Sequence, residues 1–137
     1  MREEDIEWIS IDEAIEIHDE MVRLFGGASG LRDRGKLEGA VMAVQQTWDQ
    51  ELLHRSLAEI AAGYAVYIAT DHPFVDGNKR TALAVALTFL HMNGYLKMLK
   101  RFVTLEDTMV DVVMKQITQE DLAQIFATAM GTWDEVE

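Results

Sequence analysis

One short segment between two strongly apolar stretches combines a possible base, a possible metal ligand and groups that could bind an anion. A histidine is followed four residues later by a carboxylate, and then by a glycine, an amide and two cations. A histidine can take a proton near neutral pH, and a carboxylate can hold Mg²⁺. Free backbone N–H groups at a helix start, together with cations, suit a phosphate. The residues with this potential are His72, Asp76, Gly77, Asn78, Lys79 and Arg80.

The two cations favour an anion site, because a helix start by itself disfavours them. The helix dipole prefers acidic residues in the first turn, whereas Lys79 and Arg80 are basic. A bound anion would offset that cost. Taken singly, each residue has an ordinary alternative role, since a histidine often ends a helix, Asp-Gly is a common turn and a Lys-Arg pair is usually solvated. The combination at this spacing favours a phosphate site with a base and a metal ligand.

The stretches around this segment have the hydrophobic periodicity of helices. Capping boxes predict two helix starts, at Ser10 with Glu13 and at Ser56 with Glu59. The helix expected from residue 57 is apolar nearly all round, which is typical of a buried central element. The expected helices span about 11–25, 36–48, 57–70, 78–93, 104–115 and 118–130.

The remaining elements are less strongly patterned. The last two helices have capping pairs at their starts, Thr104 with Asp107 and Thr118 with Asp121. Residues 95–102 are expected to form a loop or a short extended piece, and Trp48 is expected in the core. We therefore predict an all-α fold of about six helices, one compact domain over residues 1–137. Its active-site loop joins the two central helices, and its tail from residue 132 is frayed.

Composition excludes several classes of protein. The 137 residues include 24 acidic and 12 basic ones, a formal net charge of −12, which argues against a nucleic-acid or membrane surface. The absence of cysteine excludes disulfides, thiolate zinc sites and cysteine nucleophiles. No signal peptide or long apolar run is evident, so we expect a soluble, cytoplasmic protein. The acid-free segment 77–103 nevertheless carries five cations, Lys79, Arg80, Lys97, Lys100 and Arg101.

The segment from His72 to Leu83, which we call the signature segment, resembles the signature of the Fic/Doc fold. It is most similar to that of the death-on-curing (Doc) toxins of type II toxin–antitoxin systems. The resemblance covers about the first two thirds of the chain. It includes the stretches 17–19, 25–27 and 30–33 before the signature segment, and 89–90 and 93–95 after it.

The resemblance implies a role for each matching residue. His72 would be the general base that takes a proton from a target hydroxyl, and Asp76 would bind Mg²⁺. Phe74 would anchor the loop in the core, as its apolar character also suggests. The anion hole for nucleotide phosphates would consist of Gly77, Asn78, Lys79 and Arg80.

Two departures from the adenylylating Fic enzymes imply a different reaction. Those enzymes have glycine at the position of Lys79 and a second arginine at the position of Leu83. Doc-type proteins share the lysine, and they bind ATP in reverse so that the γ-phosphoryl group is transferred. The resemblance therefore implies an ATP- and Mg²⁺-dependent protein kinase that phosphorylates a threonine of elongation factor Tu and blocks translation. AMP transfer to a protein hydroxyl and a non-catalytic binding module remain the alternatives.

The resemblance also implies a protein partner. Some Fic enzymes restrain themselves with a Ser/Thr-x-x-x-Glu-Gly/Asn helix, but the matching spacing from Thr47 to Glu51 is followed by Leu52. Restraint by a separate antitoxin of the Phd type is then expected. Two further side-chain roles are expected outside the signature segment. Arg32 and Asp33 would form a structural ion pair, and His18 would be a satisfied core histidine.

Overall fold

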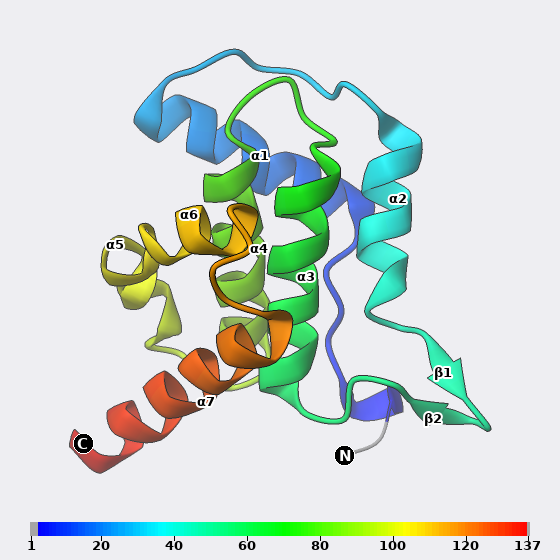
Figure 1. Cartoon of the computed structure of the whole chain (residues 1–137), viewed down its shortest axis with the longest axis vertical. Helices are drawn as coiled ribbons and strands as arrows, with labels where there is room; N and C mark the ends of the chain where they lie inside the picture. The colour runs from blue at the N-terminus through cyan, green and yellow to red at the C-terminus, as the bar shows by residue number, and fades with distance from the viewer. Residues whose placement is uncertain (1–2, 137) are drawn as a thin grey trace.

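The chain forms a helical bundle with one small hairpin, shown in Figure 1. The computed structural model describes residues 3–136, and for 132–136 it describes the backbone alone. Seven α-helices occur in this part of the chain, as expected for an all-α fold, and none is long and apolar enough to span a membrane. The elements are η1 (Glu3–Asp5), α1 (Ile11–Phe25), α2 (Arg34–Ala43), β1 (Thr47–Trp48), β2 (Glu51–Leu52), α3 (Leu57–Asp71), α4 (Asn78–Met92), η2 (Met98–Arg101), α5 (Phe102–Leu105), α6 (Thr108–Val113) and α7 (Gln119–Val136).

Helices α3 and α4 form the centre of the bundle, as their apolar sequences predict. They pack on each other, α2 and α7 pack on α3, and α1 packs on α4 (Figure 1). Each of the two central helices contributes nine buried residues to the core. The loop that joins them lies at one end of the bundle, and the β1–β2 hairpin lies near the opposite end of α3. The site is therefore carried between two rigid, buried helices.

The predicted caps are largely confirmed. Ser10 and Glu13 form a complete capping box, and Thr118 and Asp121 exchange the same pair of hydrogen bonds. The Ser56 side chain accepts from the Glu59 N–H, but the Glu59 carboxylate accepts from the N–H of Arg55 rather than from Ser56.

The second predicted helix was placed too far along the chain. Helix α2 ends at Ala43, and the chain then forms a hairpin whose turn residues, Asp49 and Gln50, have positive φ angles of 51° and 67°. The prediction that Trp48 lies in the core is wrong, because its side chain is 77% exposed on this hairpin. Both residues of β1 are exposed, and the buried residue of the hairpin is Leu52 on β2.

The region after α4 also differs from its prediction. Residues 98–101 form a 3-10 helix rather than an extended piece. The expected Thr104–Asp107 cap is wrong, since Thr104 lies inside α5 and Asp107 makes no capping hydrogen bond with its side chain. The expected single helix is instead two short ones, α5 and α6. The fraying expected from residue 132 concerns residues whose side chains lie outside the described part, so it stays a prediction.

Candidate active site

The loop between α3 and α4 reverses the chain through two left-handed residues. His72 ends α3 with φ 50° and ψ 56°, and Gly77 begins α4 with φ 74°. The left-handed conformation is rare for a residue with a side chain and is a feature of functional sites. As predicted, His72 lies at the end of one central helix and the basic residues lie at the start of the next.

Phe74 lies in the core at the middle of the loop, where an anchor of the loop would lie. Its side chain is 1% exposed and its ring stacks on that of His18, with centroids 3.9 Å apart and planes 5° apart. His18 is itself buried and forms a 2.8 Å hydrogen bond between its Nε2 and the backbone oxygen of Asp76. His18 is thus the satisfied core histidine that the sequence predicts, and it supports the loop from α1.

The Asn78 side chain closes the loop on itself. Its Nδ2 donates to the Phe74 carbonyl at 3.0 Å, and its Oδ1 accepts from the Phe74 N–H at 3.0 Å. Both polar ends of the amide are therefore engaged by the backbone of one residue. The Asn78 side chain therefore maintains the shape of the loop.

A second segment, residues 26–33, lies along the outside of the loop. Its backbone pairs with the loop, since the N–H groups of Arg32 and Asp33 both donate to the Pro73 carbonyl, and Val75 N–H donates to the carbonyl of Gly30. The expected Arg32–Asp33 ion pair is wrong. The Arg32 Nη2 donates to the His72 carbonyl at 2.6 Å, and Asp33 caps α2. The arginine therefore supports the backbone of the candidate base.

Asp76 is held by two backbone N–H groups. Its Oδ1 accepts from Gly77 at 2.9 Å and its Oδ2 accepts from Ala28 at 3.2 Å. These two donors, that of Ala28 first, hold the pKa of Asp76 below its ordinary value. The backbone of Gly27 comes so close that a Cβ there would lie 2.7 Å from Asp76 Oδ2. The carboxylate is thus ionised and fixed in place.

The predicted residues meet around one cavity of about 670 Å³. We call it the active-site cavity. All the predicted site residues except Phe74, which lies in the core, contribute to its wall. The cavity is lined by His72, Val75, Asp76, Gly77, Asn78, Lys79, Arg80, Glu106, Asp107 and Val110.

The start of α4 fits a phosphate group. Gly77 provides no side-chain cap for the first N–H groups of α4, and the first turn contains no acid. Lys79 and Arg80 lie on the same wall. Free N–H groups, the positive end of the helix dipole and two cations together form an anion cradle.

The donor set also fits a magnesium ion bound with a nucleotide. No group of three or more His, Cys, Asp or Glu side chains gathers as a metal site within the described residues. Asp76 would therefore hold Mg²⁺ together with phosphate oxygens and water, which is how Mg²⁺ is commonly held at phosphate sites.

One wall of the cavity comes from outside the predicted motif. Glu106 lies at the junction of α5 and α6, and its Oε2 accepts from the Arg80 Nε at 2.7 Å. The guanidinium carbon of Arg80 lies 4.7 Å from the centre of the Phe25 ring. No local pattern identifies Glu106, because its partner is 26 residues away in the chain.

Leu83, where Fic enzymes of the adenylylating kind have an arginine, faces the core. Its side chain is 1% exposed and belongs to the main hydrophobic cluster. A buried leucine cannot bind phosphate, so the described part of the signature segment offers Lys79 and Arg80 as its cations.

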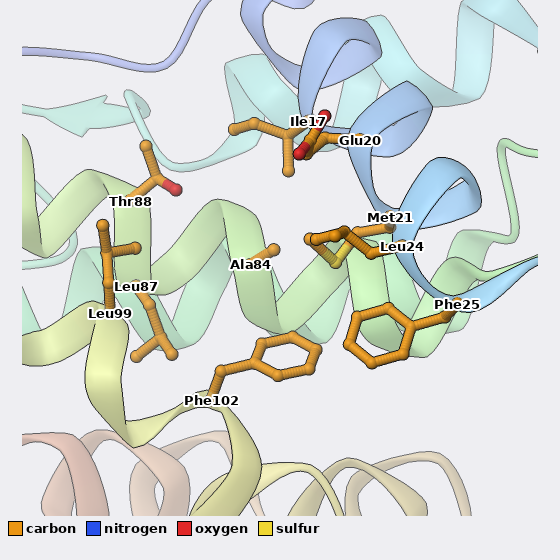
Figure 2. Close-up of a pocket in the computed structure, with 10 residues that line it drawn as sticks. All are labelled: Ile17, Glu20, Met21, Leu24, Phe25, Ala84, Leu87, Thr88, Leu99 and Phe102. Carbon is orange, nitrogen blue, oxygen red and sulfur yellow. The ribbon is translucent and has the colours of Figure 1, made fainter.

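A second, apolar cleft of about 310 Å³ lies beside the first site (Figure 2). It lies between α1, α4 and the η2–α5 segment. The rings of Phe25 and Phe102 stack at 5.5 Å and form part of its wall. Leu24 and Leu99 also line it, although both are well exposed. We call this the apolar cleft.

Comparison with known proteins agrees with the geometry. Residues 8–90 match the Fic/DOC family. The chain is 42% identical over 86 residues to "Protein kinase doc" of Escherichia phage P1, covering 63% of this chain and 68% of that protein. It is 46% identical over 70 residues to "Toxin Doc" of Mycolicibacterium smegmatis (strain ATCC 700084 / mc(2)155), covering 51% of this chain and 54% of that protein. The family match contains the whole signature segment and ends before η2. The chain belongs to the Fic/DOC family.

Proposed function

We propose that the protein is a Doc-like toxin that transfers the γ-phosphoryl group of ATP to a threonine hydroxyl of elongation factor Tu and so blocks translation. The observation that supports it best is the shared cavity, in which His72, Asp76 and the uncapped cationic start of α4 line one wall. The relatives named as a protein kinase and a toxin support the same class of activity.

Each residue then has a defined task. An imidazole nitrogen of His72 takes the proton from the threonine hydroxyl while the bond from that oxygen to the γ-phosphorus forms. The bond from the γ-phosphorus to its bridging oxygen breaks, and ADP leaves. The N–H groups of α4 with Lys79 and Arg80 bind the phosphates, and Asp76 would hold Mg²⁺, which supplies charge neutralisation when bound. Arg32 and His18 hold the backbone of the loop.

The choice of phosphoryl rather than AMP transfer depends on two positions. Lys79 has a side chain where the adenylylating enzymes have a bare backbone, and Leu83 is buried. Both features favour a phosphate arrangement different from theirs.

Isotopic labelling tests the proposal. The purified chain is incubated with elongation factor Tu, Mg²⁺ and ATP labelled at either the α- or the γ-phosphate. We expect γ-label on a threonine, and we expect His72→Ala to reduce transfer by about 10²-fold or more. Label from α-labelled ATP would instead establish AMP transfer. Absence of both labels, with no ATP binding by calorimetry, would favour a binding module.

We further propose that a Phd-type antitoxin binds in the apolar cleft. Because the proposed target is elongation factor Tu, we propose that the chain acts in the cytoplasm. The cleft is open, apolar and lined by exposed leucines, as a groove for an amphipathic segment would be. Leu24→Glu should abolish antitoxin binding, whereas Val103→Glu, at an 81% exposed position outside the cleft, should not. Equal binding by both variants would exclude the cleft.

A further inference from the structure

Arg80 is held by two residues that lie outside the signature segment. Its Nε–H donates to Glu106 at 2.7 Å, and the face of its guanidinium lies over the Phe25 ring at 4.7 Å. Helices α1, α4 and the α5–α6 junction thereby meet at one side chain. We call this arrangement the Arg80 brace.

The brace leaves the phosphate-binding end of the arginine unused. A guanidinium has five N–H donors, and the contact with Glu106 occupies the one on Nε. Among the described residues, neither terminal amino group of Arg80 has a hydrogen bond. These two groups are the pair that binds two oxygens of one phosphate. Lys79, by contrast, is exposed and has no ion pair in the described part of the chain.

The stability of the fold does not account for the brace. The Arg80 side chain is 44% exposed and that of Glu106 is 33% exposed, and ion pairs of such exposure contribute little to folding. Glu106 is nevertheless presented by a rigid element, because its neighbour Leu105 and the nearby Met109 are buried. A firmly placed carboxylate next to a phosphate site suggests a role in binding.

We propose that Glu106 and Phe25 are positioning residues that hold Arg80 ready to bind the nucleotide phosphates. This inference rests on the proposed function. An arginine side chain that has no other contacts loses rotamer freedom when it binds a phosphate. Immobilising one such side chain changes affinity by about two- to tenfold. The brace removes that cost before the nucleotide arrives.

The opposite role for Glu106 makes an opposite prediction. A carboxylate that competed with phosphate for Arg80 would weaken nucleotide binding, so its removal would tighten binding. Glu106→Gln removes the charge but keeps an amide oxygen that can still accept from Nε. Glu106→Ala removes both the charge and the acceptor.

The test measures the affinity for ATP with Mg²⁺ by calorimetry. If Glu106 positions Arg80, Glu106→Ala weakens binding by about two- to tenfold and Glu106→Gln retains wild-type affinity or binds more tightly. Phe25→Leu, which removes the aromatic face, weakens binding by about two- to fivefold. Asp111→Asn removes a carboxylate from an exposed position on α6 and serves as the matched control.

A second variant shows whether the effect passes through Arg80. In an Arg80→Ala background, Glu106→Ala should have no further effect on ATP affinity, whereas a structural role elsewhere would remain visible. Unchanged or tighter ATP binding by Glu106→Ala would overturn the proposal, as would an equal loss in the Arg80→Ala background.

The nitrogen relaxation of the Arg80 Nε–H signal provides a readout without any nucleotide. That signal should be ordered in the wild type and in Asp111→Asn, and mobile in Glu106→Ala. A mobile signal in the wild type would overturn the brace itself. If the wild type binds no ATP, the proposed function fails, and the relaxation measurement still decides whether Glu106 holds Arg80.

Discussion

Two adjacent glycines allow a sharp test of how the position of the Asp76 carboxylate is fixed. Gly26 and Gly27 have φ angles of +81° and +104°, which side-chain-bearing residues rarely adopt. Alanine is therefore strained at either position. Only Gly27→Ala places a Cβ against Asp76, at 2.7 Å from Oδ2, whereas the Cβ of Gly26→Ala meets no described atom within 4 Å.

The expected magnitudes differ between stability and binding. The backbone strain costs about 1–3 kcal/mol in each variant. For a chain of this length, that lowers Tm by roughly 3–5 °C per kcal/mol. The collision in Gly27→Ala also displaces the carboxylate from the Ala28 N–H. Loss of an outer partner of a metal ligand typically reduces metal affinity by about 10–100-fold.

The assay compares both variants with the wild type. Thermal unfolding gives the strain, and titration of Mg²⁺ in the presence of ATP gives the metal affinity. We expect both variants to lose thermal stability, and only Gly27→Ala to lose Mg²⁺ affinity. Equal Mg²⁺ affinity in the two variants would refute the conclusion that the contacts of Asp76 with Gly27 and Ala28 fix its carboxylate for Mg²⁺.

Four further predictions concern single positions. Phe74→Ala should destabilise the fold by about 3–5 kcal/mol in denaturant titrations, because it empties a buried site. Trp48→Ala should change stability by less than about 0.5 kcal/mol in the same assay, since the side chain is exposed. The lowered pKa of Asp76 keeps its carboxylate charged until the pH falls through that lowered value. Mg²⁺-dependent ATP binding should therefore not decline between pH 7 and 5 through this group. A decline that Asp76→Asn abolishes would contradict this prediction. Arg32→Ala should lower the rate of transfer but not ATP affinity, because Arg32 holds the backbone of His72 and does not line the active-site cavity. A parallel loss of affinity would contradict that role.

Local sequence signals predicted the parts of this protein that depend on neighbouring residues. The capping box at Ser10 and the apolar run of α3 predicted helices that the structure contains, because helix starts and amphipathic periodicity are encoded within a few residues. The contents of the loop were also evident, since His72, Asp76 and the start of α4 are adjacent in the chain. The anchoring role of Phe74 was implied by the resemblance to the Fic/Doc signature, and its apolar character agreed with it.

Local sequence patterns gave wrong predictions at two places where the same spacing is compatible with more than one structure. Trp48 continues the spacing of the second helix, but two left-handed residues after it turn the chain into a hairpin and leave the ring exposed. Thr104 and Asp107 have the spacing of a cap, yet this stretch forms two short helices, with Thr104 inside the first and no side-chain cap from Asp107.

The sequence by itself determined that this chain is helical and that its candidate site lies between two buried helices. Only the tertiary structure decided how the site is held. Three hydrogen bonds hold it, and each joins residues at least 26 positions apart. They link Asp76 to Ala28, His72 to Arg32, and Arg80 to Glu106. Such contacts arise from how the helices pack, and packing depends on the whole core rather than on any short stretch of sequence.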